Sequence, residues 1–239
     1  QDIPSMEVGR NFANKIWNMA RFIITTGLEA TTAADKPDSL DDYTTADQWI
    51  LHRLTETVNN ANRLFDGYQF GEAGRQINDF LWNDFADWYV ETAKVQLNEG
   101  GSRAWMTVYV LRYVLDQALR LLHPYIPYVT EEIWQQLKQA FTESDLAITP
   151  SEGWADALII AEWPDSVEAD LGLADAAEDY ERLRELVRAI RNARAETNVP
   201  AGKRIAAVIT GEKADSIAEM SGALCFLARI DEAELAIAA

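Results

Sequence analysis

Residues 102–127 read SRAWMTVYVLRYVLDQALRLLHPYIP, and this stretch decides the fold. Apolar side chains recur along it at helical spacing, at Val108, Leu111, Leu115, Leu119 and Leu122. That period predicts one buried face of a long helix. Ser102 offers a side-chain cap for the first turn, and Pro124 and Pro127 end the helix because proline has no amide hydrogen to donate.

The same helical period continues on both sides of this stretch, over residues 5–197. We expect further long helices at residues 5–27, 45–67, 71–97 and 173–197. Thr45-Ala-Asp-Gln48 has the pattern of a capping box at the start of the second helix. Thr130, followed by two acids, predicts the start of a short fifth helix. Because the turns are short, neighbouring helices are expected to run antiparallel.

The C-terminal residues follow another pattern, because Pro200 and Gly202 break the last long helix. Beyond them we expect a strand, a helix and a second strand at residues 204–210, 214–228 and 233–238. A short strand is also expected at residues 157–163. The predicted fold is therefore mainly α, an antiparallel helical bundle over residues 1–198 with a small α/β C-terminal appendage over residues 199–239.

The composition excludes several classes of protein. The chain has one cysteine, Cys225, which cannot form an internal disulfide and is expected to be a small buried hydrophobe. The two histidines, His52 and His123, lie too far apart for a Cys/His zinc site. No apolar run approaches the ~20 residues that a membrane helix needs. The sequence begins without methionine or a leader pattern, so we expect a cytoplasmic fragment of a longer protein.

The charge is strongly negative but uneven. The formal net charge is −18, which argues against indiscriminate binding of nucleic acid. Residues 146–180 contain nine acids and no Lys or Arg, whereas residues 181–204 contain seven Lys or Arg and three acids. Any contact with RNA is therefore expected to be local and specific for shape, with acidic surface repelling the polyanion elsewhere.

The first expected helix has two distinct sides when its residues are placed at 100° intervals. The predicted core-facing arc consists of two apolar stripes: Phe12, Ile16, Met19 and Ile23, then Ala13, Trp17, Ala20 and Ile24. The opposite arc holds Asn11, Asn14, Lys15, Asn18, Arg21 and Phe22. An exposed ring can stack on unpaired bases, amides can read base edges and cations can meet phosphates. On periodicity alone, the simpler interpretation is that Phe22 packs beneath a neighbouring loop.

Residues 10–22 read RNFANKIWNMARF and closely resemble the helix that opens the anticodon-binding domain of valyl-tRNA synthetases. The core Asn-Lys-x-Trp-Asn-x-x-Arg-Phe is specific, because the isoleucyl and leucyl relatives have different residues there. In that family the helix faces the anticodon loop. The resemblance therefore implies tRNA contact by Asn14, Lys15, Asn18, Arg21 and Phe22. The segment before residue 10 is shorter than the family's, which leaves the helix entrance outside this prediction.

Two further segments extend the resemblance to about residue 209. Residues 121–134, LLHPYIPYVTEEIW, are similar to a segment shared by the valyl, isoleucyl and leucyl synthetases. Residues 190–200, IRNARAETNVP, resemble the end of the valyl anticodon domain. The resemblance implies that the chain's partner is a valine tRNA, contacted at its anticodon stem and loop, and that the parent enzyme attaches valine by means of ATP and magnesium.

The catalytic signatures of class I synthetases do not occur in this sequence. A His-x-Gly-His motif cannot be built from His52 and His123, and Lys-Met-Ser-Lys-Ser is not found. We therefore expect no catalytic residue, editing site, metal or cofactor in this chain, which should be inactive without the catalytic domain of the parent chain. Nothing in the pattern suggests an oligomerisation seam, so a monomer is expected.

Two charged clusters admit more than one interpretation. Asp84, Asp87 and Glu91 share a stripe of the third helix and could bind a metal or do acid–base work, but pairing with arginines of a neighbouring helix is the preferred interpretation. A basic stripe opposite the apolar face of the last long helix consists of Arg184, Arg188, Arg191 and Arg194. This stripe could contact the tRNA backbone, or it could pair with acids of its own helix.

Alternatives remain at the level of function. The same domain of an isoleucyl-tRNA synthetase is the near alternative. A helical protein-interaction module without an RNA role is favoured by the acidity. A metal-dependent helical enzyme lacks the histidines and the Glu-x-x-His spacing of di-metal bundles.

Overall fold

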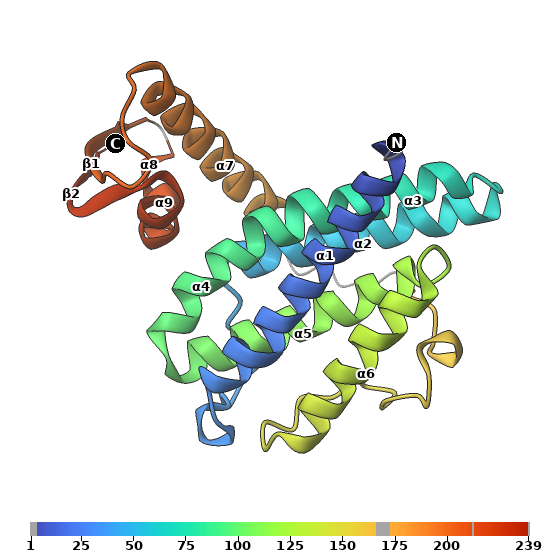
Figure 1. Cartoon of the computed structure of the whole chain (residues 1–239). Helices are drawn as coiled ribbons and strands as arrows, with labels where there is room; N and C mark the ends of the chain where they lie inside the picture. Colours follow the sequence, from blue (N-terminus) through green and yellow to red (C-terminus); the bar gives the residue numbers. More distant parts are fainter. Residues whose placement is uncertain (1–3, 166–172, 212, 239) are drawn as a thin grey trace.

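The long helices form an antiparallel bundle, and a small unit of helices and strands lies beyond it. The structure is a computed structural model that describes residues 4–165, 173–211 and 213–238. Its α-helices are α1 (Pro4–Phe22), α2 (Thr45–Asp66), α3 (Phe70–Asp79), α4 (Val90–Glu99), α5 (Gly101–Leu122), α6 (Pro127–Glu143), α7 (Leu173–Glu196), α8 (Ala214–Glu219) and α9 (Ser221–Ala228). Its other elements are the π-helical η1 (Ile23–Gly27) and η3 (Phe80–Tyr89), the 3-10 turns η2 (Ala33–Asp35) and η4 (Leu158–Ile160), and the strands β1 (Ile205–Thr210) and β2 (Ile230–Ala238). The mainly α fold with a small α/β appendage is confirmed (Figure 1).

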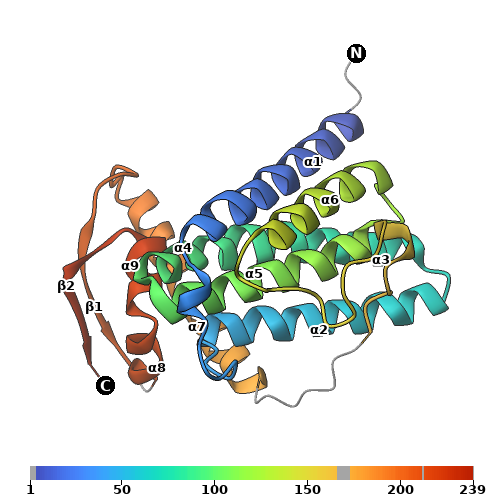
Figure 2. The ribbon, with the colours of Figure 1, turned by 90° about the horizontal axis from the view of Figure 1, so that it is seen from below.

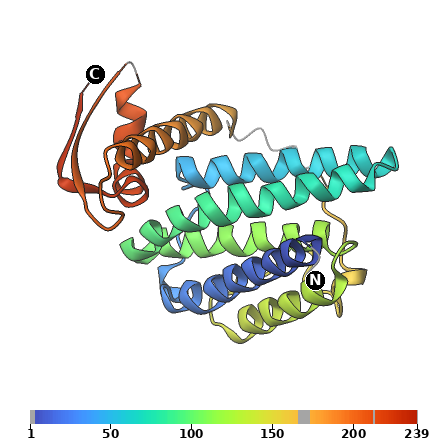
Figure 3. The same cartoon turned by 45° about the horizontal axis from the view of Figure 1, so that its top comes forward.

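Helix α5 is the centre of the bundle. It packs against α2, α4 and α6, and Figure 3 shows it between the pair α1 and α6 and the pair α2 and α3. The five apolar positions that predicted its buried face are all at most 3% exposed. Most of the other residues of α5 are buried too, as expected for a helix that is covered on several sides.

Helices α3 and α4 belong to one continuous helical segment, and the middle of this segment, η3, is π-helical. The segment was expected as a plain helix at residues 71–97, and its continuity is confirmed. In η3 the backbone bonds join residues five apart, and the amide of Val90 still donates to the carbonyl of Phe85. This change of period alters which side chains of the segment face the same way.

Asp47 joins the start of α2 to two other helices. It is fully buried, and its carboxylate accepts hydrogen bonds from the Tyr89 hydroxyl at 2.6 Å and from the Arg103 guanidinium at 2.9 Å. Burial first, and then the negative charge of Asp47, raise the pKa of Tyr89 well above its usual range. Tyr89 lies in η3 and Arg103 in α5, so this buried carboxylate links the start of α2 to two other helical elements.

Three predictions of how helices begin are wrong: the capping residue of α2 and of α5, and the first residue of α6. The cap of α2 is Thr44 rather than Thr45, because Asp47 stands at the third helical position and completes the capping box with Thr44. Helix α5 begins at Gly101 after Gly100, whose φ of +72° suits glycine, so Ser102 does not cap it. Helix α6 begins at Pro127, where the missing amide hydrogen costs nothing. Thr130 lies inside α6 and its hydroxyl contacts Nδ1 of His123 at 2.8 Å.

The appendage contains a two-stranded parallel sheet, β1 with β2, backed by α8 and α9 (Figure 2). Its strands and helices lie close to the predicted residues, and Cys225 is buried in α9 as expected, where burial raises the pKa of its thiol. Helix α7 contacts α2 at the bundle and α8 and α9 in the appendage. The division of the chain at residue 198 stays a prediction.

The strand predicted at residues 157–163 is wrong. Residues 158–160 form the 3-10 turn η4, which packs against α6 and finds no partner strand in the described part of the chain. Glu131 of α6 accepts a hydrogen bond from the amide of Leu158 at 2.9 Å, so a side chain satisfies this backbone group. Among the described residues, no helix is both long enough and apolar enough to cross a membrane.

Candidate nucleic-acid interface

Helix α1 lies at the edge of the bundle and leaves one side open. Its first apolar stripe, Phe12, Ile16, Met19 and Ile23, is buried as predicted. The exposed side chains, which we call the outer face of α1, are Glu7, Arg10, Asn11, Asn14, Trp17, Asn18 and Arg21. Arg21 donates to the amide oxygen of Asn18 at 3.3 Å. Three of the five predicted tRNA contacts, Asn14, Asn18 and Arg21, therefore share one accessible surface.

Lys15 is held at the boundary between α1 and η3. Its ammonium group lies 2.6 Å from a carboxylate oxygen of Asp87 and 3.2 Å from the carbonyl oxygen of Trp82. The same nitrogen lies 3.8 Å from the centre of the Trp82 ring, where the cation is attracted to the π face. Phe12 stacks on this ring, at 6.2 Å and an interplanar angle of 19°. Lys15 is thus oriented by its neighbours and is not a freely mobile surface cation.

The π-helical period of η3 explains how two of its residues reach one lysine. Residues five apart in an α-helix, such as Trp82 and Asp87, lie about 140° apart around the axis. In a π-helix residues five apart are joined by backbone hydrogen bonds and lie on nearly the same side. Trp82 and Asp87 consequently both face Lys15 where α1 meets η3, and Figure 1 shows α1 crossing this segment.

The exposures that helical spacing predicts for Trp17 and Phe22 are both wrong. Phe22, expected on the open side, is half-buried against the core, with the ammonium of Lys94 5.5 Å from its ring centre. Trp17, expected to face the core, is 37% exposed. The reason is that η3 and α4 cover the side of α1 that carries Lys15 and Phe22, which rotates the open arc towards Trp17. Phe22 borders the outer face, whereas Trp17 belongs to it.

The acidic stripe of the third predicted helix consists of paired carboxylates. Asp84 is buried, accepts a hydrogen bond from Arg53 of α2 at 3.0 Å and forms an ion pair with Arg184 of α7 at 3.2 Å, which confirms the preferred interpretation for this residue. Asp87 pairs with a lysine rather than an arginine, and Glu91 pairs within its own helix. Among the described residues, no group of three His, Cys, Asp or Glu is arranged to hold a metal ion.

The basic stripe of α7 is not the exposed surface that periodicity predicted. Arg184 and Arg194 are only 6% and 7% exposed. The guanidinium of Arg184 lies 5.0 Å from each of the rings of Trp49 and Trp88. Arg188 stacks on Trp88 at 5.4 Å and remains exposed. The prediction of a stripe opposite the apolar face is wrong for the two buried arginines, because α7 is covered on more than one side.

Two arginines of α7 hold the appendage through its backbone. Arg191 donates from Nε and Nη2 to the carbonyl of Leu227, at 3.1 and 2.9 Å. Arg194 donates to the carbonyls of Arg229, Pro200 and Lys203, at 3.3, 3.1 and 2.6 Å. No sequence pattern predicts a side-chain contact to backbone carbonyls, so these hydrogen bonds of Arg191 and Arg194 could not be predicted. Phosphate contact by α7 stays a prediction for Arg188 and Arg191, which are exposed.

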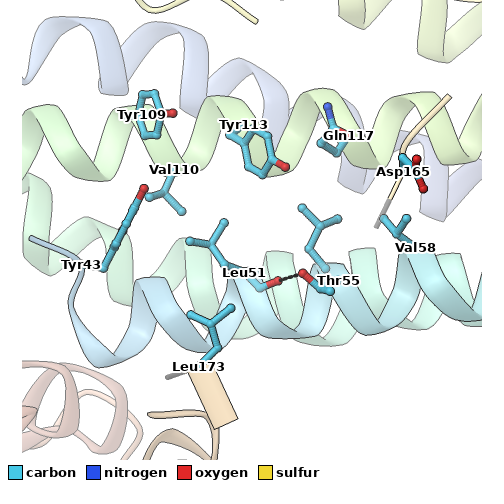
Figure 4. A pocket seen from close by; sticks show the side chains of 11 residues that line it. Tyr43, Leu51, Thr55, Val58, Tyr109, Val110, Tyr113, Gln117, Asp165 and Leu173 are labelled. Atoms are coloured by element: carbon cyan, nitrogen blue, oxygen red, sulfur yellow. Dashed lines mark hydrogen bonds between the residues drawn. The ribbon is translucent and has the colours of Figure 1, made fainter. Parts of the chain in front are cut away.

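A cavity of about 220 Å³ lies between α2 and α5 (Figure 4). Its wall is largely apolar, with the tyrosine rings of Tyr43, Tyr109 and Tyr113 and the amide of Gln117. Burial is the main cause that raises the pKa of Tyr43 to about 12. Among the described residues that line it, none is cationic, so this cavity is not suited to a phosphate group.

The fold and the outer face of α1 define a helical domain that exposes one helix face rich in amides, with two arginines and one glutamate, to solvent. The chain belongs to the family described as the anticodon-binding domain of tRNA ligase, whose sequence profile matches residues 47–209. The match begins inside α2, so α1 precedes it.

The particular relatives are valine–tRNA ligases. The chain is 44% identical to that of Enterococcus faecalis over 205 residues, which is 85% of this chain and 21% of the relative. It is 42% identical to the enzyme of Bacillus licheniformis over 82% of this chain and 20% of the relative. The enzyme of Bacillus cereus is 40% identical, with 88% and 22% covered. The chain thus spans about a fifth of the length of these relatives.

Proposed function

We propose that this chain binds the anticodon stem and loop of a valine tRNA through the outer face of α1, as part of a valine–tRNA ligase. The observation that carries the proposal is that Asn14, Asn18 and Arg21 are exposed together on one helix face. The family match and the valine–tRNA ligase relatives support it. The chain's partner in this proposal is the tRNA, and the catalytic domain would belong to the same longer protein.

The chemistry of the outer face suits unpaired bases. The amides of Asn14 and Asn18 each offer a donor and an acceptor to base edges, which are readable where a loop leaves bases unpaired. Arg21 can meet a phosphate or stack on a base. Phe22 and Lys15 would complete the contact from the border with η3. Arg188 and Arg191 are the proposed contacts to the tRNA backbone.

The remaining parts of the proposal concern the parent enzyme. It would attach valine to the tRNA by means of ATP and magnesium, and this chain would supply recognition and no catalytic residue. We propose that the chain acts in the cytoplasm as a monomer. Its net charge of −18 fits a local contact, because acidic surface away from α1 would discourage non-specific adhesion of RNA.

The test is binding of the 239-residue chain to a valine-tRNA transcript and to a transcript with its middle anticodon base changed. We expect a preference for the valine anticodon that is weakened by Phe22→Ala and by Asn18→Ala. Affinity should fall as salt rises, because phosphate contacts release counterions. Equal binding to both transcripts would contradict recognition of the anticodon. A preference for an isoleucine anticodon would favour the near alternative, and no salt-dependent binding would favour a protein-interaction module.

A further inference from the structure

Lys15 differs from an ordinary surface lysine in how many of its donors are occupied. An ammonium group has three hydrogens to donate. Two acceptors lie within hydrogen-bond distance of Lys15, the carboxylate of Asp87 at 2.6 Å and the carbonyl of Trp82 at 3.2 Å. The ring of Trp82 covers a further side at 3.8 Å. The ring attracts the charge but takes no place as an oxygen or nitrogen acceptor, so among the described residues one N–H has no such acceptor, and the Lys15 side chain is still 23% exposed.

This arrangement changes what the lysine can do. A lysine is normally a mobile point charge on a flexible stem, which attracts any phosphate without regard to geometry. A lysine whose stem and two donors are fixed has already lost that freedom before a partner arrives. The remaining N–H then points in one direction, and binding a partner costs no further side-chain entropy to orient it.

The position of Asp87 also decides which kind of acceptor Lys15 can bind without electrostatic repulsion. Its side chain is 52% exposed beside the ammonium group, so a phosphate that approached Lys15 would meet a carboxylate within the screening distance of about 8 Å at physiological salt. An uncharged acceptor, such as a carbonyl oxygen or ring nitrogen of a base, meets no such repulsion. Base edges of unpaired nucleotides present acceptors of this kind.

We propose that Asp87 is a positioning residue that, together with the Trp82 carbonyl, turns Lys15 into a directed donor to an uncharged base acceptor of the tRNA. The inference rests on the proposed function of the outer face of α1 and adds a residue from a different element, η3. Asp87 itself touches no RNA in this arrangement. It raises discrimination between anticodons at some cost in overall affinity, because it is an acid placed near a polyanion.

The experiment measures the affinity of the full chain for the valine-tRNA transcript and for the transcript with the middle anticodon base changed, at several salt concentrations. For Asp87→Ala we expect affinity for the valine transcript to be unchanged or higher, whereas the preference falls about tenfold, as for the loss of one well-oriented hydrogen bond to a charged donor. The freed lysine should then contact phosphate, which makes the salt slope steeper by about one unit.

Three further variants test whether Asp87 acts through its position beside Lys15 rather than through its negative charge alone. Asp79→Ala removes a half-exposed acid of the same long helical segment, one that pairs with Arg75, and should leave the preference unchanged. Asp87→Asn keeps an accepting oxygen in place and should retain most of the preference. In a Lys15→Ala background, Asp87→Ala should alter the preference no further, since the acid acts through the lysine.

Each outcome is decisive. If Asp87→Ala keeps the wild-type preference, or if it lowers the preference equally without Lys15, the inference is wrong while the proposed function stands. If the wild-type chain shows no preference between the two transcripts, the proposed function fails and the inference fails with it. Unchanged urea unfolding of Asp87→Ala establishes that the variant is folded, as expected for an exposed residue.

Discussion

Helices α1 and α7 both carry arginines at helical spacing, but α7 buries two of the four arginines of its stripe, whereas Arg10 and Arg21 of α1 are exposed. Helix α1 lies at the edge of the bundle, so Asn14, Asn18 and Arg21 stay exposed. Helix α7 lies between α2 and the appendage, so Arg184 and Arg194 are buried. Spacing identifies a charged stripe, but the elements that pack around the helix decide whether a partner can reach it.

The energetic consequences differ in the same way. An exposed charge contributes little to stability and remains available for binding. A buried charge must be paired, and removal of one partner leaves the other uncompensated. Variants of the buried arginines of α7 should therefore act on folding, whereas variants of the exposed arginines of α1 should act on RNA binding with little effect on folding.

The largest expected effect is that of Arg184→Ala. The variant leaves the buried Asp84 with Arg53 alone and removes the guanidinium between Trp49 and Trp88. We expect the free energy of unfolding, measured in urea, to fall by about 3 kcal/mol. Arg188→Ala, on the exposed side of the same helix, should change it by less than about 0.5 kcal/mol. Similar losses for both variants would break the comparison between buried and exposed arginines.

Arg194→Ala should have a smaller and more local effect. It removes the donor of three backbone carbonyls at the base of the appendage, which we expect to cost about 2 kcal/mol. Hydrogen exchange should accelerate in β1 and β2 and stay unchanged in α5, because the opening is confined to the appendage. Lys203→Ala is the matched control, since it keeps the carbonyl that Arg194 contacts. Uniform acceleration across the chain would show that the appendage and the bundle unfold as one.

Alkaline pH should destabilise the α7 side through Tyr180. Burial raises the pKa of Tyr180 above its usual value near 10, so the folded state holds this proton more tightly than the unfolded state does. The contribution is therefore complete below about pH 10 and is lost as the pH rises from there towards the folded-state pKa, by at most about 1.4 kcal/mol per pH unit. Tyr180→Phe should flatten the pH dependence of urea unfolding, whereas Tyr68→Phe, at an exposed position, should not. An equally steep profile in both variants would contradict this assignment.

The smallest effect belongs to the outer face of α1. Arg21→Ala should weaken binding to the valine-tRNA transcript about fivefold and reduce the salt slope by about one unit, because one cation no longer meets phosphate. Its free energy of unfolding should change by less than about 0.5 kcal/mol. Arg75→Ala, an exposed arginine paired with Glu72 and Asp79, serves as the control and should leave the affinity unchanged. Loss of stability in Arg21→Ala would place α1 in the same category as α7.

The periodicity of the sequence was sufficient to predict the bundle. The first apolar stripe of α1 and the apolar stripe of α5 are buried where the 100° spacing puts them, and the α/β order of the appendage follows from Pro200 and the apolar runs after it. The helix caps were predicted less accurately. Thr44 and Thr45 could each cap α2, and the structure shows that Asp47 completes the capping box with Thr44.

The candidate site was harder to predict, because its details depend on packing between elements distant in sequence. The exposures of Trp17 and Phe22 differ from the prediction because η3 and α4 cover one flank of α1. The contact of Lys15 with Asp87 depends on a π-helical period that a 3.6-residue pattern does not contain. Resemblance named Lys15, but its partner could be found only in three dimensions.

The anchor between α7 and the appendage has an evolutionary consequence. Arg191 and Arg194 donate hydrogen bonds to the carbonyl oxygens of residues 200, 203, 227 and 229, and every amino acid has such an oxygen. Substitutions at those four positions can therefore accumulate without loss of the anchor, provided that the local backbone path is kept. The amino-acid sequence of the appendage can thus change while its position against α7 is kept. That position depends on the two arginines of α7.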